Sequence, residues 1–254
     1  MDYTTFFYVL PLDVQRLIPL YGDKGVRPQF MFQKTFDVPH NFELRPTKRG
    51  LVVCKPATNM MQRMFKPNGT IVASEYGMWE CRDGKKWINV LWPFAYRIDA
   101  FCVTPDNGCL VYYDMWPSTK KLIKYDDAWN VQCSVNPCCD NVWGIVKLAC
   151  QSNGNVVALC CPKSVTLYSP DLHVIQTILL AYSASNFAID CSNQIVIKTL
   201  TTLYLYSSDL TQLHSAYNYG NCSKDIRIDN RGCIYLLQKQ SNSNKITILA
   251  YFFI

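Results

Sequence analysis

The residues that most often carry out chemistry in proteins are few in this chain and are not grouped. The three histidines are His40, His173 and His214. None of them lies near a pair of cysteines at a spacing that would bind zinc, and no CxxC occurs. The adjacent pairs Cys138-Cys139 and Cys160-Cys161 would point to opposite faces of a strand. We therefore predict structural thiols and solvated histidines, with no metal site and no cofactor.

Carboxylates offer a second kind of chemistry. Asp99, Asp190 and Asp229 occupy predicted first strands of an internal repeat, where paired carboxylates could hydrolyse glycosides or hold calcium. Aspartates close to glycine turns more often accept hydrogen bonds from backbone N–H groups, and we favour that interpretation. The sequence has no Walker motif, GxGxxG or GxSxG. We predict no catalytic residue and a protein that is not an enzyme.

The cysteine count is high and odd, at 13, so at least one thiol cannot pair within the chain. Seven lie in equivalent predicted strands: Cys54, Cys109, Cys160 and Cys233 in second strands, and Cys102, Cys150 and Cys191 in first strands. A free cysteine is small and readily buried. We favour buried thiols in a reducing compartment, cytoplasmic or nuclear, over a partly disulfide-bonded protein. The start of the chain lacks a basic region before its short apolar stretch, so we predict that it is not secreted.

Aromatic side chains beside cations are the candidates for binding a partner. We predict a partner-binding site from Trp79, Arg82, Lys85, Lys86, Trp87, Trp92, Trp116, Lys120, Lys224 and Lys239. Exposed aromatic residues next to cations form hot spots in protein interfaces, or stacking platforms for single-stranded nucleic acid. The alternative is that the tryptophans pack between sheets while the lysines solvate a surface.

These residues would be positioned by a repeat. Each unit has an apolar strand, a turn, a second apolar strand, and a hairpin of two more strands. The turn anchors are Gly50, Gly108, Gly154, Asn193 and Gly232. They recur roughly every 40 residues after a longer first interval, and four strands at this period are typical of a β-propeller. We predict an all-β fold, a single β-propeller of five four-stranded blades, with six as the alternative.

The predicted boundaries place the propeller at residues 30–254, after an N-terminal segment, 1–29, with a short amphipathic helix. The last unit ends without a fourth strand. Residues 30–38 resemble the fourth strands of other units, so we expect them to complete the last blade and close the ring. The longer first interval contains residues 75–96, which we interpret as a long loop over one face that forms part of the partner site.

The stretches IRIDNRGCIYLL and VTPDNGCLVYYD resemble the core of NHL repeats, and more loosely of WD40 blades. The match is an Asp, a Gly and an Ile/Val-Tyr pair, at residues 229–235 and 104–112. The Trp-Asp and Gly-His of WD40 and the Asn-His-Arg/Lys segment of NHL repeats are missing. The resemblance implies the propeller architecture. Domains of this kind usually bind proteins, and some NHL domains bind single-stranded RNA.

Charge and hydropathy limit the partners. The net charge of +6 permits an acidic partner without requiring one, and no block of five like charges occurs. No run of 18 apolar residues is present, so we predict no membrane partner. We favour a non-catalytic, protein-binding scaffold or adaptor. The alternatives are single-stranded RNA binding through a basic aromatic face, and a hydrolase or lectin with a site in the axis or between blades. Frequent Asn, Tyr, Ser and Cys with weak repeats indicate a fast-diverging sequence, which we interpret as viral or parasitic.

Overall fold

The computed structural model describes residues 28–38, 43–47, 50–54, 62–74, 77–82, 86, 88–91, 97–115, 119–137, 144–160, 163–219, 223–228, 234–239 and 244–253. All regular structure among these residues is β-strand, as predicted, and all strand pairs are antiparallel. The described residues contain no helix long and apolar enough to cross a membrane. The helix predicted near the N-terminus lies outside them. The chain divides into two compact units, one of residues 57–185 and one that combines 1–56 with 186–254.

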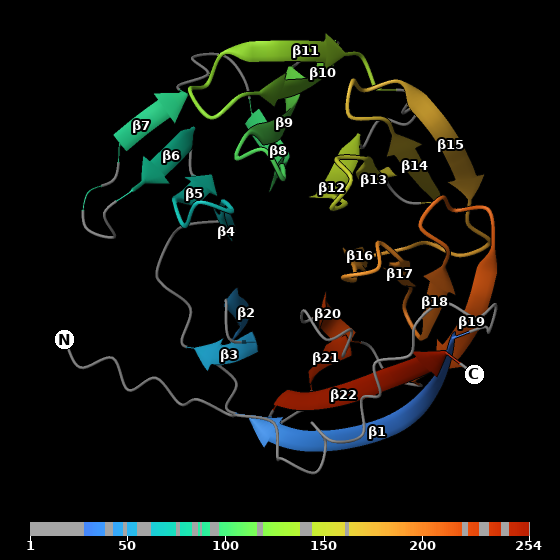
Figure 1. Ribbon diagram of the computed structural model, residues 1–254. Helices are drawn as coiled ribbons and strands as arrows, with labels where there is room; N and C mark the ends of the chain where they lie inside the picture. Colours follow the sequence, from blue (N-terminus) through green and yellow to red (C-terminus); the bar gives the residue numbers. More distant parts are fainter. Residues whose placement is uncertain are drawn as a thin grey trace. The chain divides into compact units, whose positions relative to one another are not determined.

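The unit of residues 57–185 contains three four-stranded sheets (Figure 1). The first is β4 (Gln62–Phe65), β5 (Ile71–Ser74), β6 (Met78–Cys81) and β7 (Ile88–Leu91). The second is β8 (Arg97–Val103), β9 (Cys109–Met115), β10 (Thr119–Tyr125) and β11 (Val131–Val135). The third is β12 (Ile145–Cys150), β13 (Val156–Cys160), β14 (Ser164–Tyr168) and β15 (Val174–Leu179). In each sheet, strands that follow one another in sequence are neighbours.

The other unit contains two four-stranded sheets and a hairpin. One sheet is β16 (Asn186–Ile189), β17 (Ile195–Lys198), β18 (Thr202–Tyr206) and β19 (Leu213–Asn218). The other is β20 (Ser223–Ile228), β21 (Ile234–Lys239), β22 (Asn244–Phe253) and β1 (Pro28–Val38). The hairpin is β2 (Glu43–Thr47) with β3 (Gly50–Cys54).

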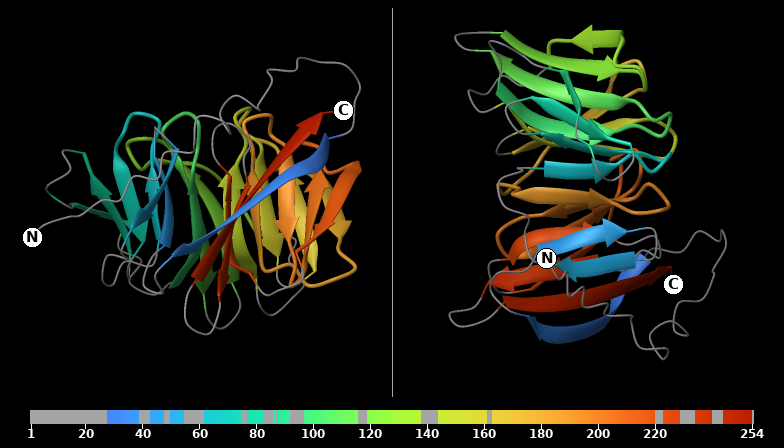
Figure 2. Two further views of the ribbon diagram at one scale, coloured as in Figure 1. Left: turned by 90° about the horizontal axis from the view of Figure 1, so that it is seen from below. Right: turned by 90° about the vertical axis from the view of Figure 1, so that its left-hand side faces the viewer.

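The N-terminal strand completes the last sheet, as the sequence predicts. β1 pairs with β22 from Pro28 opposite Phe253 to Val38 opposite Asn244, and the two strands run side by side in Figure 1 and in the right-hand view of Figure 2. This pairing supplies the fourth strand that is missing after β22. Closure of a ring and the number of blades stay predictions.

The prediction that residues 75–96 form a long loop is wrong. This stretch contains β6 and β7, the third and fourth strands of the first sheet. The first sheet begins with the β4–β5 hairpin, which lies between the first predicted turn anchor, Gly50, and residues 75–96. The hairpin β2–β3 stands apart as a two-stranded sheet. The longer first interval of the repeat therefore reflects additional strands and not an insertion.

Alternation along β9 explains how the sheets of this unit pack. Cys109, Val111 and Tyr113 join Val72 and Met78 of the first sheet in one buried cluster. The residues between them, Leu110 and Tyr112, belong to a second cluster with side chains of β12, β13 and β14. Successive side chains of a strand point to opposite faces, so one strand supplies both cores. A strand buried on both faces reads as a continuous apolar run, and residues 109–113 of this strand read CLVYY.

Each sheet whose four strands follow one another in sequence is a meander. Its first-to-second and third-to-fourth turns lie at one end, which we call the turn end, and its second-to-third connection lies at the other. The turn ends of the unit's three sheets contact one another. Asn68 N donates to Asn107 Oδ1 at 2.8 Å, and Lys124 Nζ donates to the backbone oxygen of Pro170 at 3.4 Å. These bonds fix the turn ends of neighbouring sheets side by side.

Candidate functional site

The first-to-second turns have a shared architecture with a buried polar residue in first place. Lys66, Thr104, Gln151 and Asp190 occupy this position, and all four are buried. In each turn the first residue's N–H donates to the backbone oxygen of the fifth residue, and its oxygen accepts from the fourth, as in Lys66 N to Thr70 O at 2.8 Å. The fourth residue has a positive φ in the turns of Gly69, Asn107, Gly154 and Asn193.

The carboxylate in this position acts on the backbone. Asp190 Oδ1 accepts hydrogen bonds from the N–H groups of Ser192, at 2.9 Å, and Gln194, at 2.7 Å. The interpretation of this aspartate as a turn-former is confirmed. Asp99 lies in β8, and Asp229 lies outside the described residues. Across the described part of the chain, no group of three or more His, Cys, Asp or Glu side chains could hold a metal ion.

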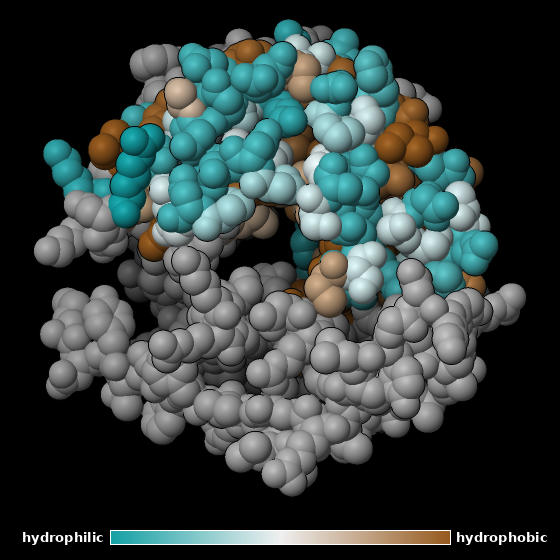
Figure 3. Space-filling view, in the orientation of Figure 1, coloured by the Kyte–Doolittle hydropathy of each residue, from teal (hydrophilic) through white to brown (hydrophobic). Residues whose placement is uncertain are grey.

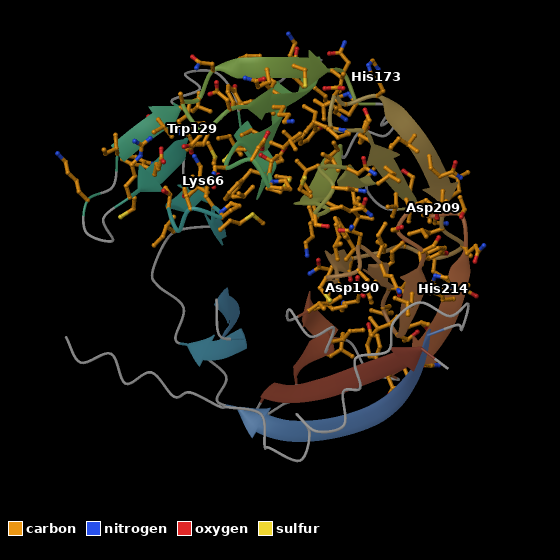
Figure 4. The ribbon with its side chains drawn as sticks, in the orientation of Figure 1. Lys66, Trp129, His173, Asp190, Asp209 and His214 are labelled. Atoms are coloured by element: carbon orange, nitrogen blue, oxygen red, sulfur yellow. The ribbon has the colours of Figure 1, made fainter. Side chains whose placement is uncertain are left out.

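Most of the repeat-equivalent cysteines among the described residues lie in the strands that the sequence predicts for them. His173 and His214 lie in the β14–β15 turn and in β19 (Figure 4), and His40 is outside the described residues. The described cysteines have free thiols: Cys81, Cys102, Cys109, Cys133, Cys150, Cys160 and Cys191. Burial raises the pKa of the Cys109 and Cys150 thiols to about 12, which keeps them protonated at neutral pH. The prediction for Cys191 is wrong, because it lies in the turn after β16 and is exposed.

A group of paired charges lies at the turn end, between the first and second sheets. We call Lys66, Glu80, Arg82, Asp127 and Trp129 the Lys66 cluster. Lys66 Nζ is 2.7 Å from Asp127 Oδ1 and 3.6 Å from Glu80 Oε1, and it lies 5.1 Å from the centre of the Trp129 ring (Figure 4). Trp129 Nε1 donates to Glu80 Oε2 at 2.9 Å. The ammonium group is thus paired with two carboxylates and with an aromatic face.

Glu80 connects this buried group to the surface. Its side chain is 3% exposed, and its Oε1 accepts from Arg82 Nε at 3.1 Å. The Arg82 side chain is 67% exposed. Burial alone would raise the pKa of the Glu80 carboxyl, but the hydrogen bonds from Trp129 and Arg82 and the charges of Lys66 and Arg82 outweigh burial and lower it. Glu80 is therefore ionised at neutral pH and holds the Arg82 guanidinium at the surface.

Part of the predicted partner site lies in this cluster or near it in sequence. Trp79 is half-buried in β6, Arg82 follows the end of β6, and Lys86 is exposed before β7. Arg82 and Lys86 are at or near the turn end, whereas Trp79, the second residue of β6, lies nearer the opposite end. Lys120 lies near the start of β10, at the opposite end of its sheet. The structure brings Arg82 and Lys86 to one end of the unit and places Lys120 at the other.

The remaining predicted residues lie in the other compact unit or outside the described residues. The backbones of Lys224 and Lys239 lie in β20 and β21, in the other compact unit. Lys85, Trp87, Trp92 and Trp116 lie outside the described residues.

The turn end mixes both signs of charge. Asp106, Asp127 and Asp171 are exposed there, at the tips of turns in the second and third sheets. Asp106 is held by Thr104 Oγ1 and lies 3.6 Å from Lys124 Nζ. Burial would raise the pKa of Asp106, yet the Thr104 hydrogen bond, the Lys124 charge and the backbone N–H of Gly108 lower it. Carboxylates held in place by hydrogen bonds and the exposed cations Arg82 and Lys86 therefore lie at the same end of this unit.

Sequence reasoning missed Lys66, Glu80 and Trp129. The available signal was the likeness of K-P-N-G-T, residues 66–70, to T-P-D-N-G, residues 104–108, which marks residue 66 as the first position of a first-to-second turn. No comparable pattern marks Glu80, because its role comes from contacts with residues far along the chain.

The sequence and the structure give different comparisons with known proteins. No protein-family model and no curated protein matches the sequence. The structure resembles a gluconolactonase from Xanthomonas campestris, with a TM-score of 0.58 and 12% identity over 82% of this chain and 78% of that one. It also resembles the β-propeller domain of Cps50 (Swd1) from Myceliophteria thermophila, with a TM-score of 0.57 and 11% identity over 85% and 99%. A third similar structure is BBS1N in complex with ARL6DN, with a TM-score of 0.54 and 16% identity over 78% and 69%.

These similarities define the fold class. Together with the four-stranded antiparallel sheets, they identify the fold as a β-propeller. Sequence identities this low establish architecture and not activity, because one propeller architecture carries many unrelated activities. The more specific resemblance to NHL repeats stays a prediction.

Proposed function

We propose that this chain is a protein-binding β-propeller, a scaffold or adaptor, and that the turn end of the unit of residues 57–185 contacts the partner. The observation that carries the proposal is the exposed Arg82 guanidinium held by the buried Glu80. Arginine is enriched among the residues that dominate binding energy in protein interfaces. A side chain that is already oriented loses less conformational entropy when a partner binds.

The charges around Arg82 favour a protein over a nucleic acid at this end. Asp106, Asp127 and Asp171 are exposed there together with Arg82 and Lys86. A phosphate backbone is uniformly negative and would be repelled by the aspartates. A protein surface can present complementary charges of both signs.

The test uses two variants that change the charge equally. In one, Arg82→Gln and Lys86→Gln remove two cations at the turn end. In the control, Lys120→Gln and Lys163→Gln remove two cations at the other end. Partners are captured from the native host, identified by mass spectrometry, purified, and titrated against each variant. We expect the first variant to bind at least about 10-fold more weakly, since hot-spot residues contribute more than about 1–2 kcal/mol.

The control variant should bind as the unaltered protein does. Both variants should melt within a few degrees of it, because surface substitutions usually cost less than about 0.5 kcal/mol. Equal binding by all three proteins would contradict the proposed site. Loss of binding in the control alone would move the site to the other end.

A hydrolase is the second candidate, favoured by the structural similarity to a gluconolactonase. The purified chain would then accelerate the hydrolysis of gluconolactone above the rate in buffer. Single-stranded RNA binding is the third candidate and would place RNA at the opposite end, where Lys163 is exposed. Titration with a mixed oligonucleotide at two salt concentrations tests it, because phosphate contacts weaken steeply as salt rises.

A further inference from the structure

The strand β15 is an edge strand with an unusual composition. It pairs with β14 on one side, and within the described residues it has no neighbouring strand on the other. It exposes three large apolar side chains, Val174, Ile175 and Leu179, of which Leu179 is 85% exposed. The fourth strands of the other two sheets in the unit, β7 and β11, expose one each, Ile88 and Val131. Figure 3 shows apolar side chains gathered over β15.

This edge lacks most of the features that normally protect an edge strand. Natural edges carry charges, prolines or bulges that prevent pairing with another chain. From Val174 to Ile189 the sequence has no charged residue and no proline. A register shift at the start of β15, between the pairs Leu167–Gln176 and Tyr168–Val174, is the only irregularity in its pairing with β14. The stretch from Gln176 to Leu179 pairs regularly with β14, and its other edge is available for pairing with another strand.

The backbone groups that face outward can be identified. Leu180 N donates to Lys163 O at 2.7 Å, so the N–H and C=O of Leu180 point toward the β14 side. In an antiparallel strand these groups alternate in direction from residue to residue. Ile178 therefore also bonds toward β14, and the backbone groups of Thr177 and Leu179 face the free edge.

We propose that β15 pairs with β15 of a second copy of this chain, antiparallel, about a twofold axis at Ile178. In this register Thr177 lies opposite Leu179 of the other copy, and Leu179 lies opposite Thr177 of the other copy. Both are hydrogen-bonded pairs, so every outward N–H and C=O of the regular stretch is satisfied. Ile178 lies opposite its own symmetry mate, at the closer spacing of a non-hydrogen-bonded pair.

Charge and symmetry are the reasons for choosing a second copy as the occupant. Identical strands related by a twofold axis place like residues close together, and like charges opposite each other are destabilising. The uncharged β15 avoids this penalty. A twofold contact is also closed, so it forms a dimer and not a fibre. The contact is short, which puts its buried area at or below the low end for specific interfaces and makes the dimer weak and concentration-dependent. The inference does not depend on the proposed function.

Sedimentation of the full chain over a range of concentrations tests the pairing. We expect a reversible monomer–dimer equilibrium. Leu179→Lys places a charge on the edge and should give a monomer at every concentration. Val131→Lys, the matched change on the edge strand β11, should dimerise as the unaltered chain does. A chain that remains monomeric at the highest concentration, or forms larger assemblies, overturns the proposal, as does equal loss of the dimer in both variants.

Oxidative cross-linking tests the register. Ile178→Cys should give a disulfide-linked dimer under mild oxidation, because the two Ile178 positions face each other across the axis. Leu179→Cys should cross-link much less, because it faces Thr177 of the other copy. The unaltered chain, with its exposed Cys191, is the background control. Cross-linking at 179 that equals or exceeds that at 178 would overturn the proposed register, and cross-linking no greater than background at both positions would overturn the pairing.

Discussion

Single residues in the third-to-fourth turns have an unfavourable backbone conformation, and two of them combine it with a buried side chain. Trp129, Leu172 and Leu210 have φ values of 66°, 65° and 62°. A left-handed conformation costs a residue with a side chain roughly 1–2 kcal/mol. Leu172 and Leu210 are each only 2% exposed, and Leu172 packs in the cluster between the second and third sheets. Burying a leucine side chain contributes about 1.5–3 kcal/mol, which offsets the backbone cost.

At Leu172 we predict that the usual order of stability, in which an alanine variant is more stable than a glycine variant, does not hold. Leu172→Ala should destabilise the protein by about 2–5 kcal/mol through the lost side chain. Leu172→Gly loses one more carbon but relieves the left-handed strain, so it should be no less stable than Leu172→Ala. At the control position Leu148, in the regular strand β12, glycine should be worse than alanine by about 0.5–1 kcal/mol. Denaturant unfolding measures all four variants, and the same order at both positions would contradict the argument.

Glu80 gives a prediction about pH. Its pKa is below its ordinary value of 4.5 in the folded protein, so its ionised form contributes stability above that value. This contribution is lost as pH falls through the lower folded pKa. Glu80→Gln leaves Lys66 with one carboxylate fewer and should cost roughly 2–4 kcal/mol at pH 7. Its free energy of unfolding should then fall less steeply below pH 4.5 than that of the unaltered protein.

The exposed Asp171 is the matched control for this measurement. Asp171→Asn should change the free energy of unfolding little at pH 7, because surface substitutions usually cost less than about 0.5 kcal/mol. Denaturant titrations between pH 3 and 7 provide the comparison. If Glu80→Gln has the same acid dependence as the unaltered protein, Glu80 does not contribute through its charge.

At the scale of elements, the sequence predicts the hairpins well because turn chemistry is local. The residues Asp-Asp, Ser-Pro-Asp and Ser-Ser-Asp, which suit tight reversals, lie in the β10–β11, β14–β15 and β18–β19 turns. The sequence does not predict the boundaries of the first sheet, because the hairpin β2–β3 has the same local pattern as the start of a repeat unit. The sequence does not predict the Lys66 cluster, because the cluster brings together residues of different sheets. Packing across sheets leaves no periodic signal in one sequence, whereas the strand β1 was found through its likeness to other fourth strands.

The pairing of β1 with β22 predicts the effect of a truncation. Deleting residues 1–38 removes β1 and leaves β22 as an uncovered edge of ten residues. An exposed edge of this length invites aggregation. We expect the truncated chain to aggregate or to lose a cooperative melting transition. A synthetic peptide of residues 28–38 should restore the transition, and a scrambled peptide should not. A truncated chain that is soluble and melts as cooperatively as the full chain would show that β1 is dispensable.

At the scale of the whole molecule, the predicted single propeller over residues 30–254 has a consequence for unfolding. The structure has two compact units, and the chain leaves one near residue 56 and returns to it near residue 186. The unit of 1–56 and 186–254 thus depends on both ends of the chain, with β1 and β22 in one sheet. If the blades form one domain, both units should unfold together.

Calorimetry on two core variants, one in each unit, tests this prediction. Leu110→Ala removes a fully buried side chain from β9, and Leu205→Ala removes one from β18. Each should cost about 2–5 kcal/mol. In a single cooperative domain, each variant lowers the temperature of one shared transition. If two transitions separate, with Leu110→Ala lowering only one and Leu205→Ala only the other, the units fold independently and the single-domain prediction is wrong. A change on the surface, Lys163→Gln, should leave the transition where it is, because surface substitutions usually cost less than about 0.5 kcal/mol.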